Sequence, residues 1–148
     1  MIVEARVTIN GSRAAIWAAI IDIENASKII RGIKNIEVLE KPVDGLVGMR
    51  WRETRIYFGK PATVEKRITD AAENEFYKTR SESDGFEFFT TNRISEGSRG
   101  TTLTGSHETR PQGVGATLRS IPMLLFKGVV KKAIMQDLND IKSAVEQG

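Results

Sequence analysis

Residues 33–110 contain no run of apolar residues at the spacing of an α-helix. Short extended runs are instead separated by turn-forming sequences, namely KPVDGLVG, GKP, DAAEN, DG and EGSRG. Runs of this length with turns between them are typical of consecutive antiparallel strands. This half of the chain therefore predicts a meander of about six strands, and the remaining segments must fold against that sheet.

The residues before this region predict one strand and two short helices. Apolar and polar residues alternate along residues 3–9, as a half-buried strand requires. Ser12 is a suitable N-cap for a helix that ends near Asp22, and a shorter apolar turn at residues 26–30 is stopped by Gly32. The apolar face of the first helix comprises Ile16, Trp17, Ile20 and Ile21.

The residues after the meander predict one long helix. Pro122 suits its first turn, and about 25 residues rising 1.5 Å each give a rod of about 37 Å. Such a rod is long enough to lie across a whole sheet. Its apolar stripe at helical spacing comprises Met123, Phe126, Val130, Ile134, Leu138, Ile141 and Val145.

Composition limits the domain count and the chemistry. The chain has 148 residues, of which 40% are hydrophobic, which suits a single domain over residues 1–148. It has no cysteine and one histidine, His107, which excludes disulfides, thiolate metal sites and sites built from several histidines. We therefore expect no metal and no cofactor.

The N-terminal residues MIVEARVTIN lack the apolar run of a signal peptide, and no later stretch is long and apolar enough to span a bilayer. We expect a cytoplasmic protein without integral membrane association. The net charge is +3, with 22 basic and 19 acidic residues interspersed along the chain. Basicity of this kind, without basic blocks, does not favour nucleic acid as a partner.

Three segments carry a resemblance to a known family. SRAAIWAAIIDIENASKIIRGIKNIEVLE is similar to its opening pattern, with Trp17, Asp22 and Gly32 in the characteristic places. GLVGMRWRE resembles the entry to its third strand, and MLLFKGVVKKAIMQDLNDIKSAVE resembles its terminal helix. With the order of elements, the chain resembles the START-like or SRPBCC superfamily, which includes polyketide cyclase/dehydrase-type proteins, lipid-transfer proteins and the birch-pollen-allergen fold.

The resemblance implies an α+β helix-grip fold. A seven-stranded curved antiparallel sheet would wrap around the long C-terminal helix, with two short helices between strands 1 and 2. Members of the superfamily variously bind lipids, sterols or polyketides in a cavity between sheet and helix, or cyclise or dehydrate polyketides. They share structural motifs but no common catalytic signature.

Hairpin geometry predicts which side chains face that cavity, because opposed residues in an antiparallel pair share a face. The turn at Asp84-Gly85 is a strong two-residue hairpin signal. It predicts the pairs Ser83 with Phe86, Ser81 with Phe88, Thr79 with Thr90 and Tyr77 with Asn92. The strand after this hairpin must keep Leu103 inside, which adds Gly105, His107 and Thr109 to the inner face. On the strand from residue 62 to residue 68, Thr63, Glu65 and Arg67 suit solvent, which leaves Ala62, Val64, Lys66 and Ile68 inside.

The strand within GMRWRETRIYFG has two possible inner faces. One is Trp51, Glu53, Arg55 and Tyr57, and the other is Arg50, Arg52, Thr54, Ile56 and Phe58. The first set is predicted to be inside, because two aromatic rings and a Glu/Arg pair are less costly to bury than two unmatched arginines.

The pairing of this strand with the next has two candidate registers. A tight hairpin at Gly59-Lys60 puts Glu53 opposite Lys66, but Pro61 lacks the amide that would close that loop. A slip of two residues puts Arg55 opposite Lys66 and keeps the same inner face.

The predicted inner face is too polar for a dry core, so we expect a partly wet ligand cavity. Glu53 and His107 are the candidate acid/base residues. Glu53 could equally be a cross-strand ion pair with Lys66 and Arg55, and a lone histidine is more often structural than catalytic. The candidate ligand-binding residues are Trp51, Arg55, Tyr57, Lys66, Tyr77, Thr79, Phe88, Thr90, Asn92, Met123, Phe126 and Val130.

Three functional hypotheses follow. The first is the binding of a small hydrophobic or amphiphilic ligand by a monomer or homodimer. The second is a polyketide cyclase or dehydratase-like enzyme, in which Glu53 or His107 moves a proton while Tyr77 or Asn92 steadies an enolate. The third is a protein-partner or nucleic-acid module that uses the outer face, where Ile56, Phe58, Phe76 and Phe89 could form a dimer contact.

Overall fold

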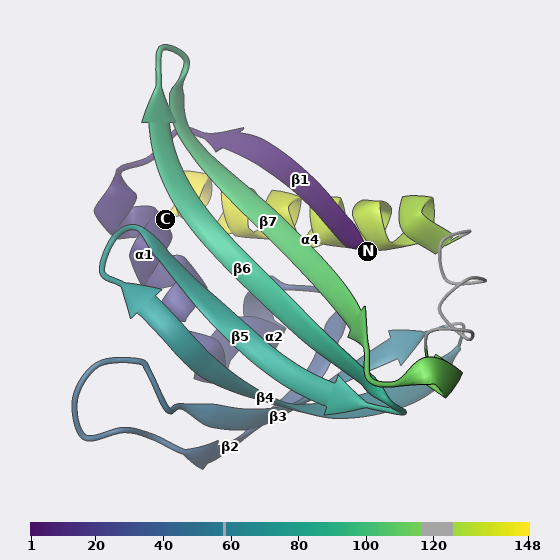
Figure 1. The fold of residues 1–148 in the computed structure, drawn as a ribbon. Coiled ribbons are helices and arrows are strands. Elements are labelled where there is room, and N and C mark those ends of the chain that lie inside the picture. Colours follow the sequence, from purple (N-terminus) through teal and green to yellow (C-terminus); the bar gives the residue numbers. More distant parts are fainter. Residues whose placement is uncertain (58, 117–125) are drawn as a thin grey trace.

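The structure is a computed structural model, and it describes residues 1–57, 59–116 and 126–148. The described residues form a seven-stranded antiparallel sheet that curves around the long helix α4 (Figure 1). The strands are β1 Ile2–Ile9, β2 Ile33–Glu40, β3 Arg50–Tyr57, β4 Lys60–Ala72, β5 Phe76–Ser83, β6 Phe86–Gly97 and β7 Gly100–Pro111. The helices are α1 Arg13–Ile21, the 3-10 turn η1 Ile23–Asn25, α2 Ala26–Ile29 and α4 Lys127–Gln147. The predicted α+β helix-grip class is confirmed.

The order of strands in the sheet explains the two short helices. The sheet runs β1-β7-β6-β5-β4-β3-β2, so β1 and β2 follow each other in sequence but lie at opposite edges. The segment α1–η1–α2 connects these edges and passes beneath the same face that α4 covers (Figure 1). This connection gives the space beside α4 a third wall.

Helix α1 begins and ends as the sequence predicts. The Ser12 side chain accepts a hydrogen bond from the Ala15 amide at 3.1 Å, and Asp22 is the C-cap. Ile16, Trp17 and Ile20 are buried. The 3-10 turn η1 was not predicted, because its three residues are too short to show a period.

Helix α4 packs one face against the core. Its described residues begin at Lys127, and the predicted start at Pro122 lies outside the described residues. Leu138 and Ile141 are its buried residues, as the predicted stripe requires. The largest fully buried side chains of the described chain are Ile9, Ile16, Ile68, Leu103 and Leu138.

The β5–β6 hairpin confirms the predicted register. Asp84 and Gly85 have φ angles of 52° and 82°, the positive values that a tight two-residue turn needs. Ser83 pairs with Phe86 and Tyr77 with Asn92, with the predicted pairs between them. The two-residue turn therefore fixes the register of β5 and β6, and with it which residues of the two strands share the inner face.

The β3–β4 register differs from both predicted alternatives. Tyr57 pairs with Lys60 and Trp51 with Lys66, so Glu53 lies opposite Val64. Hydrogen-bonded and non-hydrogen-bonded pairs alternate along an antiparallel ladder. Tyr57 and Lys60 form the hydrogen-bonded pair that closes the hairpin. Pro61 belongs to the next pair, which is not hydrogen-bonded, so its missing amide costs the ladder no hydrogen bond. The shift is an even number of residues, so the predicted inner face is kept.

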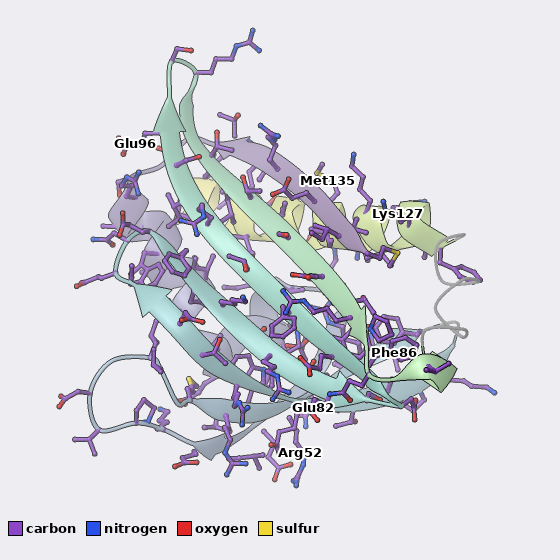
Figure 2. The ribbon with its side chains drawn as sticks, viewed as in Figure 1. Arg52, Glu82, Phe86, Glu96, Lys127 and Met135 are labelled. Atoms are coloured by element: carbon purple, nitrogen blue, oxygen red, sulfur yellow. The ribbon has the colours of Figure 1, made fainter. Side chains whose placement is uncertain are left out.

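The outer face of the sheet carries paired charges. Arg52 projects from β3 on the side away from α4 and forms an ion pair with Glu37 (Figure 2). The aromatic rings of this face are covered by cations, since Arg93 lies 4.4 Å from the Phe76 ring centroid, and Lys78 and Arg110 lie over Phe89. Phe58, the other aromatic residue predicted on this face, lies outside the described residues.

We predict that Gly105→Ala destabilises the protein by about 1–3 kcal/mol. Gly105 of β7 lies directly under α4, and a Cβ atom there would be 2.9 Å from Ile134 Cγ2 and 3.4 Å from Leu138 Cδ2. The control is Gly97→Ala in β6, where a Cβ meets nothing within 4 Å, and we expect a change within about 0.5 kcal/mol. Urea denaturation measures both, and equal stabilities would contradict the close helix–sheet packing.

Candidate functional site

A cavity of about 440 Å³ lies between the inner face of the sheet, helix α4 and the segment from α1 to β2. Its helix-side walls are mostly apolar, and Asp137 of α4 is the charged residue among them. The α1–β2 segment contributes Ala19, Ile20, Ile23, Ala26, Ile29, Ile30, Ile33 and Ile36, and α4 contributes Val130, Ile134, Leu138 and Ile141. A ligand in this space would contact branched aliphatic side chains over much of its surface.

The sheet contributes the aromatic and polar side chains of the cavity. The inner face predicted for β3 is confirmed, because Trp51 and Glu53 are 2% and 5% exposed while Arg52 faces solvent. The predicted site residues that line the cavity are Trp51, Glu53, Arg55, Tyr57, Lys66, Tyr77, Thr79, Phe88, Thr90, Asn92, His107 and Val130.

One predicted residue lines the cavity only at its rim, and two others are not part of the described lining. Tyr57 lies at the rim, with 53% of its surface exposed. Phe126 is 50% exposed and does not line the cavity, because it is the N-cap of α4 and so falls outside the helical register from which its position was predicted. Met123 lies outside the described residues.

Glu53 is the centre of the polar side of the cavity. Its Oε2 atom accepts hydrogen bonds from Arg55 Nε at 2.8 Å and from Lys66 Nζ at 3.1 Å. Its Oε1 atom accepts a long hydrogen bond of 3.4 Å from Trp51 Nε1. The carboxylate is thus buried but enclosed by donors, which is what makes a buried charge tolerable.

The surroundings of Glu53 keep it ionised. Burial pushes its pKa upward, but the charges of Lys66 and Arg55 and their hydrogen bonds outweigh this and lower the pKa to about 2. A carboxylate that is already ionised and fully bonded is poorly suited to exchange protons near neutral pH.

Arg55 connects this cluster to helix α4. Its Nη1 and Nη2 atoms donate to the two carboxylate oxygens of Asp137, at 3.2 and 2.8 Å. Burial lowers the Arg55 pKa, but the hydrogen bond and charge of Asp137 and the charge of Glu53 raise it overall, so the guanidinium stays charged. Gly32 lies close by, since a Cβ there would be 3.0 Å from Arg55 Nη1.

Sequence reasoning missed Asp137, because only the apolar positions of the last helix were followed. A signal was present. Asp137 lies three residues after Ile134 and four before Ile141, so it shares the inward face of the helix with both. An acidic residue within an apolar stripe predicts a partner on the sheet.

His107 lies on β7 with its ring stacked on Phe88 at a centroid distance of 5.8 Å. Its Nδ1 atom lies 3.2 Å from Thr90 Oγ1, a hydrogen bond whose direction depends on the tautomer. Burial, together with the charges of Lys66 and Arg55, lowers its pKa to about 4. His107 is therefore neutral at pH 7.

Tyr77 has a structural hydrogen bond. Its hydroxyl donates to the backbone carbonyl of Ile20 at 3.1 Å, and its ring makes an edge contact with Trp17 at 6.4 Å. Burial raises its pKa, while a side-chain hydrogen bond with Asn92 acts in the opposite direction. The hydroxyl proton of Tyr77, which would have to stabilise an enolate, is thus already donated to the backbone of α1.

Among the described residues, no group of three or more His, Cys, Asp or Glu side chains is placed to hold a metal ion. Within the same part of the chain, no helix has the length and hydropathy needed to cross a membrane.

Comparison with known proteins gives a result at the level of fold. No protein-family model matches the sequence, and no curated protein matches it. Among solved structures, a START superfamily protein from Mycobacterium smegmatis is similar over 99% of this chain and 97% of its own, with 20% identity and a TM-score of 0.76. Chain length and topology are thus shared almost completely.

Two other structures widen the comparison. The Zhui aromatase/cyclase from Streptomyces sp. R1128 has 20% identity and a TM-score of 0.75, over 99% of this chain and 94% of its own. Ara h 8.0201 has 18% identity and a TM-score of 0.74, over 100% of this chain and 99% of its own. The chain has the START-like, or SRPBCC, fold. The predicted resemblance is confirmed at this level.

We predict that Glu53 makes stability depend on pH in acid. Its pKa is about 2 in the folded protein against an ordinary 4.5, so the unfolded chain binds more protons between these values and stability is lost as the pH falls through this window. The loss is on the order of 2–3 kcal/mol and should be absent from Glu53→Gln. Urea denaturation at pH 6 and pH 3 measures the difference.

The control for this prediction is Glu4→Gln. Glu4 is exposed on β1 and has no ion-pair partner among the described residues, so its variant should follow the pH dependence of the wild type. If Glu53→Gln lost as much stability between pH 6 and pH 3 as the wild type, the ionised, ion-paired state of Glu53 would be wrong.

Proposed function

We propose that this protein binds a small hydrophobic or amphiphilic molecule in the cavity between the sheet and α4. The observation that carries the proposal is the internal space of about 440 Å³, which has aliphatic side chains over much of its wall and a compact polar cluster between β3, β4 and α4. Ligand pockets commonly measure 300–1,000 Å³ and combine an apolar lining with a few polar groups that fix orientation.

The polar cluster supports binding more strongly than catalysis. Its four charged side chains, Glu53, Arg55, Lys66 and Asp137, are joined by ion pairs and balance to zero net charge. Binding would be driven by burial of apolar ligand surface, at about 25 cal/mol for each Å² removed from water. The cluster would then select among apolar molecules by their polar groups.

A cyclase or dehydratase reaction is the second candidate, and one observation favours it. His107 lies in the cavity as a neutral imidazole at pH 7, able to accept a proton, whereas Glu53 is held ionised. With a poly-β-ketone analogue as substrate, we expect His107→Ala to abolish turnover if His107 is the base, and Glu53→Gln to leave the proton transfer in place. Equal turnover by His107→Ala and the wild type would remove the enzyme candidate.

We predict that at least one class of apolar compound raises the melting temperature of the protein. The panel comprises fatty acids, sterols and planar aromatic compounds. A compound that binds, present at about 100 times its dissociation constant, should raise the free energy of unfolding by about 2.7 kcal/mol, which raises the melting temperature by roughly 5–10 °C for a chain of this size. Val64→Trp should abolish the shift, because Val64 lines the cavity on β4 and an indole would occupy the ligand space.

The matched control is Thr91→Trp. Thr91 lies on β6, outside the cavity lining, so the same indole there should leave the shift intact. A panel without any shift, or a shift that survives in Val64→Trp, would count against binding in this cavity.

A further inference from the structure

Hydrogen-bond donors and acceptors on the polar side of the cavity are unequal in number. The two carboxylates there, Glu53 and Asp137, have four oxygen atoms between them. Arg55 alone donates to three, namely Glu53 Oε2 and both oxygens of Asp137. Trp51 donates to the fourth, Glu53 Oε1. Every carboxylate oxygen in the cluster therefore accepts a hydrogen bond from a donor other than Lys66.

Lys66 is the surplus donor of the cluster. Its ammonium group carries three N–H bonds and, within the described part of the chain, donates one hydrogen bond, to the Glu53 oxygen that Arg55 already serves. Lys66 lines the cavity, and its side chain is only 19% exposed. Two charged N–H donors thus remain available in a largely buried position.

Hydroxyl groups lie beside Lys66 on the next strand. Arg67 pairs with Arg80, which places the preceding Lys66 and the following Ser81 opposite each other on the inner face. Ser81 and Thr79 line the cavity with 8% and 4% exposure, and their hydroxyl groups form no hydrogen bond to any described residue. A polar group at this place would meet two hydroxyls as well as the ammonium.

We propose that the natural ligand is an amphiphile with an anionic oxygen head group of the carboxylate class, bound at Lys66 beside Ser81 and Thr79. Its apolar body lies against the isoleucine side chains of the α1–β2 segment and α4. This inference rests on the proposed binding function and adds the chemistry and the orientation of the ligand.

The surplus of charged hydrogen-bond donors at Lys66 favours an anionic head over the alternatives. An amine head would need a carboxylate, but both carboxylates are already bonded to Arg55. A neutral head would use the same donors more weakly, because hydrogen bonds between ionised partners are roughly twice as strong as neutral ones. Moving an ionised head group out of water costs free energy, and this cost is offset only where the head group accepts hydrogen bonds from a charged donor.

The test compares decanoic acid with methyl decanoate and decylamine by isothermal titration calorimetry at pH 7. The three share an alkyl chain and differ in the head group. We expect the wild type to bind the acid about 10- to 100-fold more tightly than the ester, the range set by a hydrogen bond to a charged group. The amine should bind no more tightly than the ester.

Variants on the same strand assign this preference to Lys66. Lys66→Met removes the charge with little change in length and should bring the acid to the affinity of the ester, while Lys66→Arg should keep a preference for the acid. Lys60→Met is the control, because Lys60 is exposed on β4 and does not line the cavity. The wild-type comparison needs no variant, so it decides the question even where Lys66→Met does not fold.

The outcomes separate the two proposals. Equal binding of acid and ester by the wild type would overturn the head-group inference and leave the ligand-binding function standing. An acid preference that persists in Lys66→Met would overturn the role of Lys66. If none of the three compounds bound, while the wider panel also gave no thermal shift, the proposed function itself would fail and the inference with it.

Discussion

The ion pair between Arg55 of β3 and Asp137 of α4 is the contact on which the shape of the interior depends. On the β7 side, α4 rests on Gly105, where Ile134 and Leu138 approach the backbone as closely as a missing side chain allows. On the β3 side the helix is tied to the sheet by a long arginine side chain instead. Close packing at one side and a long polar connection at the other leave the cavity between them.

Such a connection sets geometry more than it adds stability. Taking two charges out of water costs free energy that their attraction only partly returns, so an apolar pair of similar volume would often hold the helix as well. Apolar side chains would also close the gap, since nothing would keep them apart from the aliphatic walls. The linked side chains of Glu53, Arg55 and Asp137 hold the helix at a distance and place charged groups on one side of the cavity.

Much of the cavity lining could be predicted because parity passes from one hairpin to the next. The positive φ angles at Asp84 and Gly85 set the register of β5 and β6, and antiparallel pairing carries the inner face to β3, β4 and β7. Parity is robust to slips of two residues, which is why the face of β3 was right although its register against β4 was wrong. The exact partner of Lys66 depended on where the hairpin at residues 57–60 closes.

Local pattern alone determined that this chain would form an antiparallel meander followed by a long amphipathic helix, and which alternate residues of most strands would share one face. Asp137 could not be joined to Arg55 in this way, because they are 82 residues apart and no local rule relates their positions. The same holds for Lys66, whose surplus donors follow only from knowing that Arg55 and Trp51 already serve every carboxylate oxygen. Periodicity acts between near neighbours in sequence, whereas electrostatic partners and the space they enclose are decided by where the folded elements meet.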